Sequence, residues 1–457
     1  MRPTVAINVV GLAPSMVGPD TPNIARLAEQ GGMQPLHTVT PAVTCAAQVS
    51  YLTGSLPRDH GIVGNGWFFR DLSEIWFWRQ SNKLVTGEWV WEAGRKRDPA
   101  FTCANMFWWY NMYLTADIGV TPRPMYPADG RKIPDCYAKP SELRDELTDK
   151  LGPFPLFKFW GPMTDISSSQ WIADATVHVM DQSSPTLTLV YLPHLDYNLQ
   201  RLGPDHADIA RDLREVDAVC GQIIERAERD GARIIVLSEY GITPVSRPVH
   251  INRALREAGL INVRVEMERE LLDPGASTAF AVCDHQIAHI HVSDPGRIAE
   301  VKALVEALPG VERVLDEATK PEYGLDHPRS GELVAISDSD AWFTYYYWLD
   351  DARRPDFANT VEIHRKPGYD PVELFLDPAL RFPMLSVVWR LIKKKLGFRT
   401  LMDVIPLDAT LVKGSHGRVT DNDDDGPVFI TNDPALAPSK PVEATEVKDL
   451  MLRHVFD

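Results

Sequence analysis

A single threonine stands where the sequence predicts the start of a helix. The apolar spacing from Ala46 to Leu52 predicts a helix that ends at Gly54, and Pro41 precedes it. Thr44 therefore takes an N-cap-like position, with its hydroxyl and the next backbone N–H groups directed at one spot. The helix dipole and the unpaired N–H groups favour an anion such as phosphate there. Most threonines at helix starts are only caps; the alternative is an oxygen nucleophile that faces a phosphate.

Two apolar runs each deliver a carboxylate at the predicted carboxyl end of a buried strand. TLTLVYLPHLD ends in Asp196, and ARIIVLSEYGI ends in Glu239 and Tyr240. Val39 and its neighbours predict another strand, which leads to Thr44. Ligands of parallel sheets bind beyond the carboxyl ends of the strands, so this edge is the predicted site.

The order of elements predicts an α/β fold. A run from Val5 to Leu12 is apolar throughout, as in a strand that is buried on both faces. TPNIARLAEQG follows as a helix with Thr21 as N-cap, Pro22 at its first position and Gly31 at its end. Alternation of this kind predicts a doubly wound, mostly parallel sheet with helices on both faces.

We expect three regions along the chain. Residues 1–270 and 405–457 form the α/β core, with a Trp-rich insertion at about 66–165. Residues 271–330 form a small α+β subdomain, and 331–404 hold a strand pair and a connecting insertion. Aromatic side chains as dense as those of the insertion usually pack beneath long loops, and the alternative is a surface that holds a substrate.

Composition narrows the class of partner and the compartment. The 457 residues are 44% hydrophobic and 24% charged, with a net charge of −16. This charge argues against binding of a nucleic-acid polymer, but a local cation or helix terminus still permits a small phosphorylated substrate. The five cysteines are odd in number and far apart, which favours reduced thiols. With no signal-peptide pattern and no membrane-spanning run, we expect a soluble, cytoplasmic protein.

Five segments, in this order, carry a resemblance to a known family: TPNIARLAEQG, PAVTCAAQVSYLTGSLPRDHGIVGN, YLPHLDYNLQRLGPD, VLSEYGI and GSHG. They resemble the nucleotide pyrophosphatase/phosphodiesterase branch of the alkaline phosphatase superfamily, over about residues 1–260 and the final segment. The resemblance implies an alkaline-phosphatase-like fold and phosphoester chemistry with two metal ions, zinc in the family. It also implies a phosphorylated threonine as the intermediate.

The resemblance assigns roles to individual residues. Thr44 matches the nucleophile, which is also a metal ligand, and Asn65 matches the asparagine that hydrogen-bonds a phosphoryl oxygen. Asp196 matches a carboxylate ligand of the first metal, and His416 in GSHG matches an imidazole ligand. Glu239 replaces an aspartate conservatively.

Three ligand positions depart from the family pattern. Gln200 and Tyr240 each stand where the family has histidine, and Val10 stands where it has aspartate. Asn8 points to the same face as Val10, two residues deeper in the strand. The predicted metal ligands are Thr44, Asp196, Gln200, Glu239 and His416. This oxygen-rich set would suit Mg²⁺ or Mn²⁺ better than a pair of zinc ions.

Several other histidines have alternative explanations. His364 in HRKPGYDP is an alternative to His416, which we prefer because GPVFI follows it as the family's closing strand does. His285, His289 and His291 would share one face of a strand next to Asp284, but a structural role is the more common one for such a cluster. The remaining two near the site, His194 and His206, are interpreted as surface or loop residues.

These observations lead to one leading function and one rival. The leading function is a metal-dependent phosphodiesterase or nucleotide pyrophosphatase-like hydrolase that acts on a small phosphoester through phospho-Thr44. The rival is a binding or scaffold protein that retains the fold and an anion pocket but has lost efficient catalysis. Less than one tightly bound divalent ion per chain would favour the rival.

The segment 384–402, with LSVVWRLIKKKLGF at its centre, predicts a basic amphipathic helix. One interpretation places it on an anionic membrane surface as a peripheral contact. The sequence favours the other, a surface helix that docks its apolar side on the core. Exposure of Trp389, Leu391, Ile392 and Leu396 together would distinguish the two.

Overall fold

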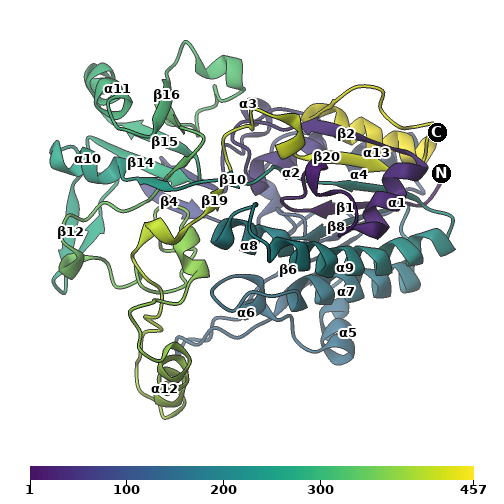
Figure 1. Cartoon of the computed structure of the whole chain (residues 1–457), viewed down its shortest axis with the longest axis horizontal. Coiled ribbons are helices and arrows are strands. Elements are labelled where there is room, and N and C mark those ends of the chain that lie inside the picture. Colours follow the sequence, from purple (N-terminus) through teal and green to yellow (C-terminus); the bar gives the residue numbers. More distant parts are fainter.

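A nine-stranded sheet forms the centre of the computed structural model, which describes residues 1–457 (Figure 1). The strand order is β21-β2-β20-β9-β1-β8-β5-β6-β7. These strands are β1 (Thr4–Val9), β2 (Gly32–His37), β5 (Cys103–Met106), β6 (Ile118–Pro122), β7 (Cys136–Lys139), β8 (Leu187–Leu192), β9 (Arg233–Leu237), β20 (Val428–Thr431) and β21 (Val442–Glu443).

The middle of the sheet is parallel, as predicted. Strand β1 pairs in parallel with both β8 and β9, so that Asn8 lies opposite Tyr191 on one side and Leu237 on the other. Every residue of β1 and β8 is buried, which explains their continuous apolar sequences. The outer strands β20 and β7 are antiparallel to their inner neighbours.

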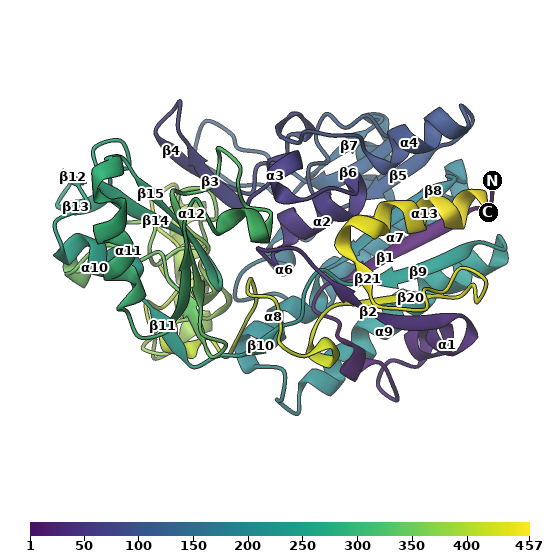
Figure 2. The same cartoon turned by 90° about the horizontal axis from the view of Figure 1, so that it is seen from above.

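Helices cover both faces of the sheet (Figures 1 and 2). One layer contains α1, α7 and α9, which contact one another, and the other contains α2, α4 and α13. The helices of this part of the chain are α1 (Pro22–Gln30), α2 (Thr44–Thr53), α3 (Pro57–His60), α4 (Val90–Arg97), α5 (Glu142–Leu151), α6 (Leu156–Phe159), α7 (Ser167–Ser183), α8 (His194–Leu202), α9 (Ile209–Arg229) and α13 (Val447–Phe456). The predicted doubly wound α/β fold is therefore confirmed.

The chain enters α2 differently from the prediction. A strand around Val39 was expected, but β2 ends at His37 and lies antiparallel to β20. Residues 38–43 form a loop that crosses to the start of α2. Prolines at positions 35 and 41 remove backbone N–H donors on either side of this stretch, which limits its pairing.

A second lobe surrounds a separate four-stranded antiparallel sheet, of order β14-β15-β17-β16. We use this name for residues 245–412, whose buried apolar side chains form a 36-residue cluster distinct from the 78-residue cluster of the central sheet. The strands are β14 (Ala279–Asp284), β15 (Ile287–Val292), β16 (Val311–Leu315) and β17 (Leu333–Ser337), and the helices are α10 (Ile251–Glu257), α11 (Ile298–Glu306) and α12 (Pro383–Lys395).

Four short two-stranded pairs complete the structure, and two of them lie within the second lobe. They are formed by β3 (Gly66–Phe69) with β4 (Glu74–Phe77), β10 (Thr243–Pro244) with β19 (Gly414–Ser415), β11 (Arg247–Val249) with β18 (Ala341–Phe343), and β12 (Val263–Glu266) with β13 (Arg269–Leu272). Sequence analysis expected a strand pair after residue 331. Strands β17 and β18 instead pair with different partners, β17 within the lobe sheet and β18 with β11. The predicted domain bounds remain a proposal, and the residues of the second cluster place the start of the second lobe before residue 271.

Residues 66–165 supply β5, β6 and β7 to the central sheet and the β3–β4 pair to the second lobe. Of the 20 aromatic side chains in this region, ten are buried, and nine of these belong to the main hydrophobic cluster, Trp67, Trp89, Trp91, Trp108 and Trp109 among them. Five more are partly buried against one of the two clusters. Packing therefore accounts for most of this aromatic density. None of the helices combines the length and the apolar character that crossing a bilayer requires.

Candidate active site

Thr44 is the first residue of α2, and its hydroxyl does not cap the helix. The N-cap is Val43, which has an extended backbone, so the predicted capping role of Thr44 is wrong. The Thr44 Oγ1 atom lies 3.1 Å from the phenol oxygen of Tyr240. A hydroxyl that is not needed by the helix is free to take part in chemistry.

The phenol of Tyr240 lies between Thr44 and Asp196. Tyr240 follows β9 and donates its O–H to Asp196 Oδ1 at 3.2 Å. Because a phenol has one proton, this arrangement leaves Thr44 to donate its own proton to the Tyr240 oxygen. The structure thus connects Thr44 to a buried carboxylate by two consecutive hydrogen bonds.

Asp196 lies in the first turn of α8, directly after β8. Gln200, one helical turn later, donates Nε2–H to Asp196 Oδ2 at 2.8 Å and also contacts the phenol of Tyr369 at 3.1 Å. Burial raises the pKa of Asp196 to about 7, and the hydrogen bonds from Tyr240 and Gln200 oppose this rise. A carboxyl group with this pKa exchanges protons readily near neutral pH.

Glu239 is held by two amide side chains from different elements. Asn8 of β1 donates Nδ2–H to Glu239 Oε1 at 2.6 Å, and Gln48 of α2 donates to the same oxygen. The other oxygen, Oε2, is buried and has no hydrogen-bond partner. Burial raises the pKa of Glu239 to about 8, against the opposing effect of the hydrogen bonds from Gln48 and Asn8. Asn8 therefore binds a carboxylate in the site, whereas Val10 is fully buried and apolar.

His416 contributes a neutral imidazole. The carbonyl of Ala42 accepts a hydrogen bond from Nδ1–H of His416 at 2.8 Å, which leaves Nε2 with its lone pair, 3.9 Å from Asp196 Oδ1. Burial lowers the pKa of His416 well below its ordinary value. Its ring stacks on Tyr240 with centroids 3.6 Å apart, and on its other side lies the ring of His285, at 3.7 Å.

Two residues of the second lobe, Asp284 and His285, complete the site. Asp284 accepts hydrogen bonds from the backbone N–H of Asn65 at 2.7 Å and from Asn65 Nδ2 at 3.1 Å. The oxygen of the Asn65 amide accepts from the N–H of Cys45 in the first turn of α2. His285 contacts Asp284 Oδ1 through Nδ1 at 2.8 Å, and its ring lies 3.6 Å from that of Tyr369. Asn65 therefore links the start of α2 to the second lobe.

Sequence analysis did not assign Asp284 or His285 to the site. It placed His285 on one strand face with His289 and His291, but His285 lies in the turn between β14 and β15, with a φ of 60°. This left-handed conformation directs the ring away from the strand. The available signal was an Asp-His pair between two apolar runs, in AVCDHQIAHI.

The other histidines considered lie outside this group. His289 contacts the carbonyl of Val63, and His291 is packed against Phe68 in the lobe core. The alternative ligand His364 is wrong, because its Nδ1 lies against the carbonyl of Phe77. These three histidines therefore have structural contacts. His206 is exposed as expected, but His194 is buried rather than on the surface.

The residues do not fit the pair of zinc ions that the resemblance implied. Val10 offers no ligand atom, Tyr240 occupies a ligand position with a buried neutral phenol, and Gln200 presents an amide N–H to Asp196. Burial raises the pKa of Tyr240 well above its ordinary value, so the phenol keeps its proton. His416 presents a free lone pair beside Asp196, and Glu239 has an unpartnered Oε2, but the ligand atoms of these three residues do not all lie within 4.8 Å of one another.

A different group of metal-ligating types lies outside the site. His194 of α8 and Asp212 and Glu215 of α9 bring one ligand atom each to within 4.8 Å of one another. Glu215 Oε2 lies 3.1 Å from His194 Nε2, and Arg211 pairs with both acidic residues. Arg211 already provides a positive charge to both carboxylates.

An aromatic group adjoins the site on the side of Tyr369. Trp160 and Trp78 have ring centroids 5.6 and 6.1 Å from that of Tyr369, and Trp109 lies 4.9 Å from Trp78. Trp78 and Trp160 are partly exposed, unlike most tryptophans of the 66–165 region. They are therefore the aromatic residues best placed to contact a ligand.

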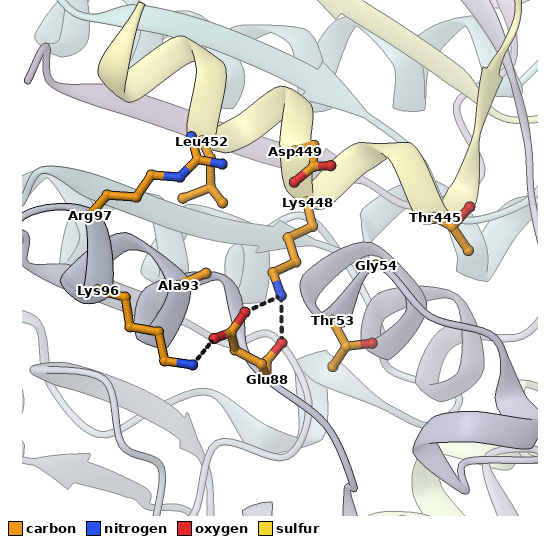
Figure 3. A pocket seen from close by; sticks show the side chains of 10 residues that line it. All are labelled: Thr53, Gly54, Glu88, Ala93, Lys96, Arg97, Thr445, Lys448, Asp449 and Leu452. Atoms are coloured by element: carbon orange, nitrogen blue, oxygen red, sulfur yellow. Dashed lines mark hydrogen bonds and ion pairs between the residues drawn. The ribbon is translucent and has the colours of Figure 1, made fainter.

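A cavity of about 390 Å³ lies between α2, α4 and α13, away from Thr44 (Figure 3). Glu88 accepts ion pairs there from Lys96 and Lys448, as the dashed lines in Figure 3 show. Both lysines are paired with Glu88, and Asp449 also lines the cavity, so we do not interpret it as an anion site.

Comparison with known proteins identifies the family. The family model of type I phosphodiesterase/nucleotide pyrophosphatase matches residues 4–370. The chain belongs to this family. It is thus a member of a family of phosphoric-ester hydrolases that are generally metal-dependent, and its match includes Thr44, Asp196 and Glu239.

A curated relative is an uncharacterised pyrophosphatase/phosphodiesterase of Schizosaccharomyces pombe, 27% identical over 238 residues. The match covers 50% of this chain and 41% of that protein, so the chain spans less than half the length of this phosphodiesterase relative.

Two solved structures share the fold of this phosphodiesterase family member. Phosphonoacetate hydrolase from Sinorhizobium meliloti, in complex with phosphonoformate, has a TM-score of 0.62 at 16% identity, covering 99% of this chain and 96% of that one. An inactive variant of murine ectonucleotide pyrophosphatase/phosphodiesterase 5, in complex with AMP, has a TM-score of 0.60 at 15% identity, covering 100% and 95%. The predicted resemblance and fold are confirmed.

Proposed function

We propose that this protein hydrolyses a small phosphoester through a phosphorylated Thr44. The observation that carries the proposal is the hydrogen-bonded series from Thr44 through Tyr240 to Asp196. It gives the nucleophile a route for its proton in a member of a phosphodiesterase family. Asp196, with a pKa of about 7, is the base.

The first step forms the bond between Thr44 Oγ1 and phosphorus. The Thr44 proton passes to the Tyr240 oxygen while the Tyr240 proton passes to Asp196 Oδ1, and the ester oxygen leaves with the electrons of the broken P–O bond. Water then attacks the phosphothreonine and forms a new P–O bond as the bond to Thr44 Oγ1 breaks. The Thr44 oxygen takes the Tyr240 proton, Tyr240 takes the proton stored on Asp196, and the proton lost by the water passes through solvent to the alkoxide released in the first step. Tyr240 is neutral before and after the exchange, as a buried phenol must be.

A divalent cation would be held by Asp196, Gln200 and His416, with Glu239 as a further carboxylate near Thr44. Its chemistry would be to balance the negative charge of the phosphoryl group. The oxygen-rich set favours Mg²⁺ or Mn²⁺ over zinc. Asn65, whose amide is fixed by Cys45 and Asp284, is the proposed donor to a phosphoryl oxygen once substrate is bound.

The substrate that the site suits is a small molecule with an aromatic or otherwise flat leaving group. Trp78 and Trp160 stand beside Tyr369 at the site, where a flat group would stack. The related phosphodiesterase structure with AMP and the hydrolase structure with phosphonoformate hold ligands of the expected size. Buried, unpaired thiols at all five cysteines support the proposal of a reducing, cytoplasmic location.

The test is hydrolysis of bis(p-nitrophenyl) phosphate with Mg²⁺, Mn²⁺ or Zn²⁺ supplied in turn, together with mass spectrometry of acid-quenched protein. We expect turnover and a phosphate on Thr44. The variant Thr44→Ser should retain part of the turnover, and Thr44→Ala should retain none. Full turnover by Thr44→Ala would eliminate the mechanism, and absence of turnover with every cation would favour the binding-protein alternative.

A further inference from the structure

Helix α12 stands apart from both sheets, at the lower edge of the molecule in Figure 1. None of its residues is buried. Pro383 occupies the first helical position, and Lys393, Lys394 and Lys395 lie in the last turn, where the helix dipole favours cations. The helix is therefore encoded locally, without an apolar face against the core.

The side of α12 that faces the protein is largely polar, and Val387 is the one side chain of the helix that packs against the hydrophobic cluster of the second lobe. Its half-buried residues recur at helical spacing and are Pro383, Ser386, Val387, Arg390 and Lys393. Arg390 donates to Asp403 at 2.6 Å, which fastens this side to the following segment. An ordinary surface helix has the opposite orientation, with its apolar side inward.

The opposite side of α12 is apolar and exposed to solvent. Leu385 is 66% exposed, Trp389 57% and Leu396 69%. The other large apolar residues exposed in and around the helix are Phe382, Met384, Val388, Leu391, Ile392, Phe398 and Leu401. The docked helix that the sequence favoured is therefore wrong. An apolar patch of this kind on a soluble protein marks an interaction site.

The charges around this apolar side are all positive. Residues 381–399 contain no acidic residue, and their cations are Arg381, Arg390, Lys393, Lys394, Lys395 and Arg399. The whole chain carries a net charge of −16, so the segment is a local exception. Lys393 Nζ lies 5.4 Å from the ring of Trp389, so cation and apolar residue meet at the edge of the exposed side.

We propose that α12 binds the surface of an anionic lipid membrane, with Leu385, Trp389 and Ile392 inserted at the level of the headgroups. A helix with an apolar side, flanking lysines and an interfacial tryptophan has the composition that lies in the plane of a bilayer surface. Anionic lipids attract the basic cluster, and they repel the acidic remainder of the protein, so α12 is the face that docks.

The same charges argue against a second copy of the chain as the occupant. In a parallel two-fold contact Lys393, Lys394 and Lys395 of the two copies would face one another, and in an antiparallel one they would face the Arg381 end of the partner helix. Residues 381–399 contain no acidic residue, so both contacts would bring only positive charges together. Like charges at the rim of an interface oppose association. An anionic lipid surface provides both an apolar interior for the exposed apolar side chains of α12 and negative charges for its lysines.

The test is co-sedimentation of the full-length protein with vesicles at low salt. Vesicles of phosphatidylcholine alone are compared with equimolar phosphatidylcholine and phosphatidylglycerol. We expect binding to the mixed vesicles, little to the neutral ones, and weakening as salt is raised. Brominated acyl chains in the mixed vesicles should quench part of the tryptophan fluorescence of the wild type. This quenching should be weaker in Trp389→Phe, because Trp389 is the tryptophan that inserts.

Two variants separate the apolar and charged contributions. Lys393→Glu/Lys394→Glu/Lys395→Glu should lower the partition coefficient by about 100-fold or more. Leu385→Ser/Trp389→Ser/Ile392→Ser should lower it by at least about 10-fold. Matched controls at exposed positions elsewhere are Lys83→Glu/Arg229→Glu/Lys440→Glu and Leu72→Ser/Val265→Ser, which should bind as wild type does.

Circular dichroism melts establish that each variant is folded. Wild-type protein that fails to bind mixed vesicles at low salt overturns the proposal, as does equal binding by wild type and the lysine variant. A wild-type dimer in sedimentation equilibrium that the apolar variant converts to a monomer would assign the patch to self-association instead.

Discussion

The ring of Tyr240 lies flat against the ring of His416, with centroids 3.6 Å apart and an angle of 5° between the planes. The stack fixes the phenol oxygen in one place, where it contacts both Thr44 and Asp196. A tyrosine at this position is therefore more than a lost histidine ligand. It supplies a rigid hydroxyl at the point where the family resemblance implies a metal.

Removal of this hydroxyl is the most direct test of the proposed proton route. Tyr240→Phe keeps the stack on His416 but separates Thr44 from Asp196. We expect kcat to fall by about 10²–10⁴-fold, the usual contribution of general base catalysis, with little change in melting temperature. The control Tyr369→Phe removes a phenol that contacts Gln200 but not Thr44, and its kcat should fall much less. Equal losses from the two variants would contradict the route.

Glu239 predicts a pH dependence of stability in the metal-free protein. Burial raises the pKa of Glu239 from 4.5 to about 8, so the folded state binds a proton that the unfolded state releases above pH 4.5. Stability from this group is thus complete below pH 4.5 and is lost as the pH rises toward 8.

The isosteric variant Glu239→Gln does not titrate. It should match wild type in acid and exceed it above pH 8, by on the order of a few kcal/mol in the free energy of unfolding. Urea unfolding with a chelator present, across this pH range, measures the difference. The exposed control Glu225→Gln should show no such divergence. A constant difference between Glu239→Gln and wild type at all pH values would mean that the pKa of Glu239 is the same in the folded and unfolded states.

Restoring the family ligands should create a strong zinc site. The triple change Val10→Asp/Gln200→His/Tyr240→His returns one carboxylate and two imidazoles. Val10 is fully buried, so an aspartate without metal should lower the free energy of unfolding by about 2–4 kcal/mol. Zinc should restore the loss, because it binds only the folded state. Melting temperatures that are equal with and without zinc would show that the three positions do not converge on one ion.

Lys366 should be important for the stability of the second lobe. Its Nζ lies 2.8 Å from Asp370 and 2.7 Å from Glu373, and all three side chains are almost fully buried. Lys366→Met leaves two buried carboxylates without their cation, at a cost of roughly 3–5 kcal/mol. The matched variant Lys366→Met/Asp370→Asn/Glu373→Gln removes the charges together and should recover much of this. Urea unfolding measures both; a cost below about 1 kcal/mol for Lys366→Met would refute the prediction.

The sequence predicts the elements of the central sheet well because their signals are local. The apolar run of β1 and the proline and glycine that bound α1 each reflect a backbone preference within a few residues. The motif around Thr44 and the two strand-end carboxylates likewise lie on single elements. Residues of this kind could be placed near one edge of the sheet without any knowledge of the second lobe.

What the sequence could not predict depends on contacts between distant segments. The contact of Thr44 with Tyr240 could not be predicted, because the two residues are 196 positions apart. His285 was assigned to a strand face because a left-handed turn residue other than glycine has no reliable sequence signal. The outward apolar side of α12 was the less favoured of two interpretations, because periodicity shows that a helix has two sides, but not which of them faces the protein.

The row of stacked rings begins in one hydrophobic cluster, at Tyr240, passes through His416 and His285, and ends in the other, at Tyr369. The two clusters are separate, and the stacked row forms only while the two lobes keep their relative position. Mild denaturant or heat should therefore abolish turnover before either the central sheet or the second lobe unfolds. Loss of turnover would then indicate that one lobe has shifted relative to the other. Circular dichroism would not detect this shift, because the secondary structure of both lobes is unchanged.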